Sequence, residues 1–136
     1  YRKPRDLVSA SVFSDPPINT AMVSKRGSEI VTLGGVRWPA GRLAAGLADG
    51  DYTLGIRPHH ITAEARPGSE PIEGRVLVTE ISGSESVIHF DMHGATWVSQ
   101  SHGIHAMPVG STAHLHVDHS HGFLFGADGR LIEVRG

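Results

Sequence analysis

Glycine and proline interrupt this chain so often that a long helix has no room in it. The 136 residues include 17 glycines and 8 prolines, which recur at short, regular intervals as turn signals. No apolar pattern with the 3.6-residue period of a helix continues for several turns. Short alternating segments between turn residues are typical of a β-sandwich or a small β-barrel. We therefore expect an all-β fold made of small barrels with OB-fold-like connections.

The expected strands fall into two groups, separated by the Pro- and Gly-rich segment 67–71, which reads as a linker. The first group covers residues 7–13, 21–24, 29–33, 36–38, 52–57 and 61–65. The second group covers residues 72–81, 86–92, 95–100, 112–117, 122–125 and 131–134. Between residues 25 and 28, Lys-Arg-Gly-Ser is a hairpin signal. The sequence thus predicts one domain, 1–136, built of two intertwined β modules at approximately 1–66 and 72–136.

Two of these segments show which side chains should face the core. In 86–92 the apolar residues alternate with polar ones, so that Ile88, Phe90 and Met92 point inward. In 112–117 the inward face is Ala113, Leu115 and Val117, which leaves His114, His116 and Asp118 in solvent.

Charge and composition exclude several classes of function. The formal net charge is −2 and there are eight aromatic residues, whereas a nucleic-acid binder carries a basic footprint and stacking aromatics. We expect no nucleic-acid partner. The absence of cysteine rules out disulfides and thiolate metal sites. No apolar run approaches the roughly 18–20 residues that span a bilayer.

Known catalytic motifs are missing from the chain. It contains no G-x-x-x-x-G-K-[ST] phosphate loop, no G-x-G-x-x-G after a strand, no H-E-x-x-H and no G-x-S-x-G. No spacing links a nucleophile to a base. We therefore expect no catalysis in this chain, no catalytic residue and no cofactor-binding residue.

Histidine is unusually frequent, with ten residues and a dense run over 114–121. On a strand His114 and His116 share a face, which could begin a zinc or nickel site and would suit a zinc-dependent enzyme. The same alternation leaves both imidazoles in solvent, and no spacing fixes a further ligand. We expect no metal site.

Two polar turns are the candidate contact surface. The strand with Leu54 and Ile56 ends in the turn Arg57, Pro58, His59 and His60, since proline removes a ladder donor and restricts the residue before it. A Gly/Ser turn, Ser82, Gly83, Ser84 and Glu85, joins the strands 72–81 and 86–92. Backbone amides of such a turn can cradle an anion, but the flanking glutamates oppose one and favour a plain hairpin.

In order, these segments resemble a known family: the C-terminal regulatory region, called a TOBE or MOP-like domain, of the ATP-binding subunits of sugar-type ABC importers of the maltose and glycerol-3-phosphate class. The resemblance covers essentially the whole chain. The matching residues are Tyr1 with Pro4, Ser14 to Asn19, Leu54 to Pro58 with His60, Glu73 to Val76, Glu80 with Gly83 to Glu85, Leu124-Phe125, and Asp128-Gly129. His59 stands where this family usually has a glutamate.

The resemblance implies a regulatory and dimerisation domain of an importer for a sugar, a polyol or a glycerol phosphate. The parent protein would be an ABC transporter ATPase, with ATP and Mg bound by an ATPase domain upstream of Tyr1. Its partners would be a second copy of the ATPase subunit, the transporter's membrane subunits through the ATPase domain, and a regulatory protein. The location implied is cytoplasmic, peripheral on the inner face of the cell membrane.

One alternative shares this architecture, a free-standing molbindin-like β-barrel that binds small oxyanions. Molybdate-binding modules of the related type carry a Ser-Ala-Arg-Asn signature. Here Ser9-Ala10-Ser11-Val12 lacks its arginine and asparagine. The sequence therefore does not predict a molybdate or tungstate pocket.

Overall fold

The computed structural model describes residues 18–41, 44 and 46–132. Throughout this part the regular structure is β-strand, apart from three short 3-10 helices, and the predicted all-β class is confirmed. The strand expected at 7–13 and the last two residues of the strand expected at 131–134 lie outside the described residues. Within the described part, no helix has the length and apolar character needed to cross a membrane.

The chain divides into two units whose limits follow strand pairing rather than chain order. Unit 1 contains the described residues up to Ile56 and those from Ser120 onward, and unit 2 is Arg57–His119. The expected modules, 1–66 and 72–136, have other limits because the last strands pair with the first sheet. The supposed linker 67–71 lies inside unit 2, where Glu70 and Pro71 are already strand residues.

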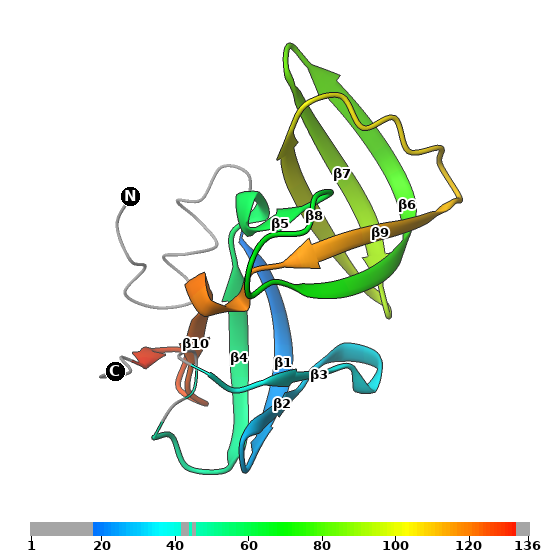
Figure 1. Ribbon diagram of the computed structural model, residues 1–136. Coiled ribbons are helices and arrows are strands. Elements are labelled where there is room, and N and C mark those ends of the chain that lie inside the picture. Colours follow the sequence, from blue (N-terminus) through cyan, green and yellow to red (C-terminus); the bar gives the residue numbers. More distant parts are fainter. Residues whose placement is uncertain (1–17, 42–43, 45, 133–136) are drawn as a thin grey trace. The chain divides into compact units, whose positions relative to one another are not determined.

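Unit 1 is a six-stranded antiparallel sheet in the order β11-β10-β4-β1-β2-β3 (Figure 1). Its elements are β1 (Asn19–Arg26), β2 (Glu29–Val31), η1 (Leu33–Gly35), β3 (Arg37–Pro39), β4 (Gly50–Ile56), β10 (Phe123–Phe125) and β11 (Leu131–Ile132). The predicted hairpin is confirmed, since Arg26 pairs with Glu29. Gly27 takes the positive φ of 59° that the turn requires.

The core of unit 1 lies where β4 passes between β1 and β10. Leu54, Ile56 and Phe125 are fully buried there. Gly55 is fixed by close packing, because a Cβ at this position would lie 2.9 Å from Ile18 Cδ1 and 3.1 Å from Phe125 Cε2. Because Gly55 in the Leu-Gly-Ile stretch has no side chain, the last strands of the chain can pack closely against β4.

Unit 2 is a five-stranded antiparallel sheet in the order β5-β9-β6-β7-β8 that curves into a nearly closed barrel. Its elements are η2 (Pro58–His60), β5 (Ile61–Thr62), β6 (Glu70–Ser82), β7 (Glu85–Met92), β8 (Ala95–His102) and β9 (Thr112–Val117). The two edges approach each other, since Ala63 N–H donates a hydrogen bond to Ser101 Oγ at 2.9 Å. Closure of this kind removes exposed edges from the sheet.

The predicted core faces of unit 2 are confirmed. The inward side chains are all buried: Ile88, Phe90, Met92, Ala113, Leu115 and Val117. Trp97 on β8 is 1% exposed and completes this core. A β-bulge between Val76 and Val78 shifts the register of β6 against β7, which increases the local bend of a sheet.

Candidate functional site

The first predicted contact turn is a short, well-anchored 3-10 helix, η2. Arg57 has the extended conformation (φ −69°, ψ 145°) expected before a proline, and Pro58 occupies the first helical turn, where its fixed φ fits. His60 N–H donates to the Arg57 carbonyl at 3.0 Å. Asp118 N–H donates to the His60 carbonyl at 2.9 Å. The turn is therefore tied to the end of β9 within unit 2.

The side chains of this turn are only partly available to a partner. Pro58 is buried, and Arg57, His59 and His60 are half-buried. The rings of His59 and His60 have centroids 4.1 Å apart at an interplanar angle of 44°. Arg57, His59 and His60 therefore offer only part of their side-chain surface for contact.

The second predicted turn is the tip of the β6–β7 hairpin. Gly83 has φ +60°, and Ser82, Gly83 and Ser84 are exposed. Ser84 contributes its carbonyl to a hydrogen bond from Gly103 N–H at 2.5 Å. Glu85 is half-buried and accepts a hydrogen bond from Gln100 Nε2 at 2.8 Å. This turn is polar, exposed and held in place by the residues that follow β8.

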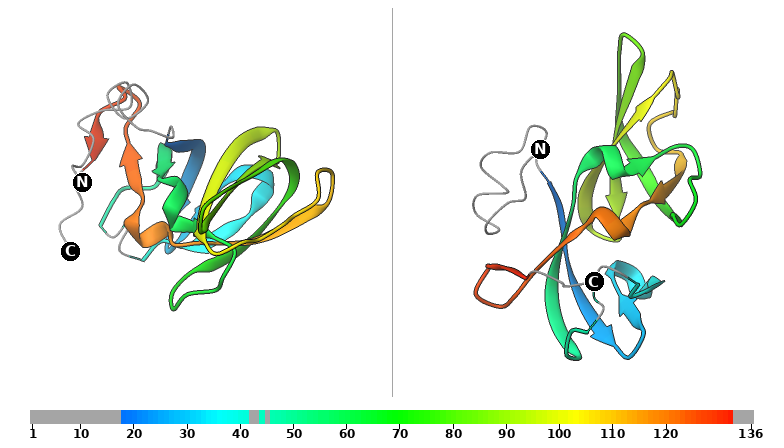
Figure 2. Two further views of the ribbon diagram at one scale, coloured as in Figure 1. Left: turned by 90° about the horizontal axis from the view of Figure 1, so that it is seen from above. Right: turned by 60° about the vertical axis from the view of Figure 1, so that its left-hand side comes forward.

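The structure does not bring the two turns into one cluster. Strand β8 is their common neighbour, because η2 packs against β8 and the hairpin tip bonds to Gly103, just past its end. Figure 1 shows the tip of the β6–β7 hairpin well apart from η2, the short coil before β5 (Figure 2 gives two further views). They are two separate candidate contacts on one barrel.

Exposed apolar side chains accompany the hairpin, and sequence reasoning missed them. The segment 103–111 runs beside the second half of β6, with Gly110 N–H donating to the Val76 carbonyl at 2.8 Å and Thr79 Oγ1 to the Met107 carbonyl at 2.7 Å. Four large apolar residues on β6 and this segment are exposed: Val78, Ile81, Ile104 and Val109. We call these four residues the hairpin apolar set. The alternation of polar and apolar residues did not predict these exposed side chains. Val78 and Ile81 follow the β-bulge, and Ile104 and Val109 lie in a segment without regular secondary structure.

The histidines at the end of β9 differ in exposure, and the prediction that His116 and Asp118 lie in solvent is wrong, because both are half-buried. His114 is exposed and His116 half-buried, whereas His119 is 6% exposed. Burial lowers the pKa of His119, against a smaller opposing effect of the Glu70 and Asp118 charges. The signal was present in the sequence: the inward alternation of Leu115 and Val117 continues to residue 119.

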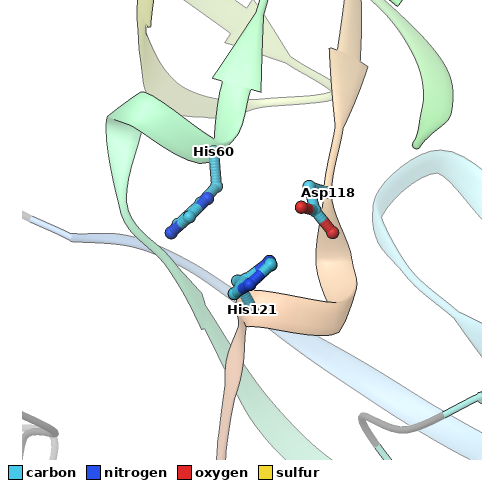
Figure 3. Close-up of side chains that lie close together, drawn as sticks. All are labelled: His60, Asp118 and His121. Carbon is cyan, nitrogen blue, oxygen red and sulfur yellow. The ribbon is translucent and has the colours of Figure 1, made fainter. Parts of the chain in front are cut away.

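Figure 3 labels the side chains of His60, Asp118 and His121. His60 and Asp118 belong to unit 2, and their possible ligand atoms lie within 4.8 Å of each other. His121 belongs to unit 1. A zinc site takes three or four protein ligands, and within unit 2 the described residues add no third donor to this pair.

Comparison with known proteins gives one family and a consistent set of relatives. The family described as "TOBE domain" matches residues 54–125. The chain is 33% identical to the sn-glycerol-3-phosphate import ATP-binding protein UgpC of Salmonella typhimurium over 92 residues, 65% of this chain and 25% of that protein. The same values hold for UgpC of Escherichia coli K12. UgpC of Yersinia enterocolitica is 25% identical over 122 residues, 86% of this chain and 34% of that protein.

The chain therefore spans about a quarter to a third of the length of the curated relatives that it matches. The matched family segment starts inside β4 and ends with β10, so it contains all of unit 2 and both predicted contact turns.

Proposed function

The chain belongs to the TOBE domain family, and from this premise we propose that it is the C-terminal regulatory and dimerisation region of an ABC importer's ATP-binding subunit. The observation that carries the proposal is the agreement of the TOBE match with relatives that are all named import ATP-binding proteins. The chain covers only a small part of each relative, which supports a role as one part of a larger subunit.

For the imported solute we propose sn-glycerol-3-phosphate, within the wider class of sugars, polyols and glycerol phosphates. The support is the name shared by the relatives from Salmonella, Yersinia and Escherichia coli. In this proposal the present region performs no catalysis, and ATP and Mg are bound by the ATPase part of the same subunit. The subunit would work on the cytoplasmic face of the cell membrane, joined to the membrane subunits through its ATPase part.

The hairpin tip is the stronger of the two proposed contact turns. Ser82, Gly83 and Ser84 are exposed, and the hairpin apolar set provides exposed apolar surface on the same strand and the adjoining segment. Large exposed apolar side chains beside a polar turn are a feature of many protein–protein contacts. We propose that a second copy of the subunit or a regulatory protein contacts this surface, with η2 as a separate contact.

Uptake measurements test the proposed function. Cells that lack the gene are complemented with the full-length gene, and uptake of radiolabelled sn-glycerol-3-phosphate is compared with uptake of maltose and glycerol. A full-length variant with the P-loop lysine changed to alanine is the control for ATP dependence. We expect restored, ATP-dependent uptake of sn-glycerol-3-phosphate. If only maltose or glycerol uptake is restored, that compound replaces sn-glycerol-3-phosphate as the proposed solute. If the uptake of none of the three compounds changes, the result contradicts the importer role.

A further inference from the structure

Unit 2 has an unusual set of charged residues. It holds nine of the ten histidines of the chain, three arginines, seven carboxylates and no lysine. Imidazoles therefore outnumber the permanent cations of this unit by three to one. Imidazole is the side chain that gains or loses its charge between pH 5 and 8.

Three glutamates of the sheet lie close to imidazoles on the neighbouring strand. The distances are 3.3 Å from Glu73 Oε1 to His114 Nδ1, 3.8 Å from Glu80 Oε1 to His89 Nε2, and 4.0 Å from Glu85 Oε1 to His102 Nδ1. The pairs cross β9–β6, β6–β7 and β7–β8 in turn, which are three consecutive strand pairs of the four in the sheet.

All three pairs lie on the outer face of the barrel. Glu73 is directly opposite His114, between inward residues on both strands. His89 is directly opposite Val78 on the bulged strand and reaches Glu80 diagonally. Glu85 is directly opposite His102. These are the separations at which side chains on neighbouring strands interact.

We propose that protons reinforce the barrel of unit 2, because mild acid converts three neutral imidazole–carboxylate contacts into ion pairs, one across each strand pair from β9 to β8. This proposal rests on the register of the strands and on the distances between the paired glutamate and histidine atoms. It does not depend on the proposed importer role. An ion pair forms where a protonated imidazole lies beside an ionised carboxylate, and histidine is the residue type whose charge ordinarily changes between pH 5 and 8.

Other charged groups around the pairs set the size of the effect. Arg75 on β6, opposite Thr112, and His116 on β9 oppose a positive charge on His114. Asp91 on β7 favours a positive charge on His89, and the facing β8 residue, Val98, is uncharged. His105, whose Nε2 lies 2.9 Å from the His102 carbonyl oxygen, opposes a positive charge on His102.

The buried His119 works in the opposite direction. Its lowered pKa means that the unfolded chain takes up the proton at a higher pH than the folded one. The stability that the neutral ring gives is therefore complete above the ordinary histidine value and declines as pH falls below it. The pH dependence of the unaltered chain mixes both effects, so the three pairs are measured by comparing variants.

Urea unfolding of the full chain at pH 8 and pH 5.5 tests the proposal. Fluorescence of Trp97 reports on unit 2 in a Trp38→Phe background, since Trp38 lies in unit 1. The test variant is His89→Gln/His102→Gln/His114→Gln. The second variant is Glu73→Gln/Glu80→Gln/Glu85→Gln, which removes the other partner of each pair. The control is His93→Asn, an exposed histidine at a positive-φ turn outside the three pairs.

Exposed ion pairs are individually weak, so three together should change the unfolding equilibrium constant about fivefold. We expect the ratio of the histidine variant's constant to that of the unaltered chain to be about fivefold larger at pH 5.5 than at pH 8. The glutamate variant should show the same change and His93→Asn none. A ratio independent of pH in the histidine variant, or in the glutamate variant, would overturn the proposal.

Discussion

At the scale of single residues, Gly74 shows how little space the sheet of unit 2 leaves. A Cβ on Gly74 would clash with Phe90 Cδ2 and lie 2.7 Å from the Asp91 carbonyl oxygen. One of these atoms belongs to the backbone, so rotation of a side chain cannot relieve the contact. Gly74 therefore lets β6 cross the large ring of Phe90, which is fully buried.

Gly74→Ala should destabilise unit 2 by about 1–3 kcal/mol, the usual cost of forcing extra atoms into a packed core. The measurement is urea unfolding followed by Trp97 fluorescence. Arg75→Ala, a change at the exposed next residue of β6, serves as the control and should have a small effect. Equal stability of Gly74→Ala and the unaltered chain would show that the sheet can adjust around this position.

At the scale of elements, the sequence pattern predicted most strands, because alternation and turn residues are local properties. The segment 112–117 is strand β9 with the same limits, and the hairpin at Gly27 forms as expected. The start of β6 was missed, since Glu70 and Pro71 read as linker although they pair with Val117 and His116. That pairing depends on a strand more than forty residues away. The positions of the two predicted contact turns followed from the sequence, whereas the exposed residues beside the hairpin did not.

The proposed hairpin contact leads to a prediction about this element. Ile81→Ser, at an exposed position, should change folding stability by less than about 0.5 kcal/mol. In the full-length protein it should weaken self-association by about fivefold to tenfold, as truncation of a contributing interface residue does. Light scattering over a concentration series measures this. Met22→Ser, an exposed apolar position on β1 of unit 1, is the control, and an equal effect of both changes would argue against the hairpin as the contact.

At the scale of the whole molecule, one chain builds two sheets by leaving unit 1 after β4 and returning to it with β10. Phe123, Leu124 and Phe125 pair with Gly55, Leu54 and Thr53. Both strands can be found in the sequence, but no local pattern indicates that residues about seventy positions apart pair with each other. For this reason the all-β class could be predicted from turn spacing, whereas the limits of the two units could not. The family resemblance was carried by short motifs in order, and the TOBE match confirms it.

The most direct test of the central claim is the coding sequence on the 5′ side of the codon for Tyr1. The claim that this chain is the TOBE region of an importer's ATP-binding subunit predicts a continuous reading frame there. That frame should carry a G-x-x-x-x-G-K-[ST] phosphate loop and a Leu-Ser-Gly-Gly-Gln-like signature. A start codon at or just before Tyr1, with no such frame upstream, would contradict the claim and leave a free-standing β-barrel, for which small-oxyanion binding would be the function to test.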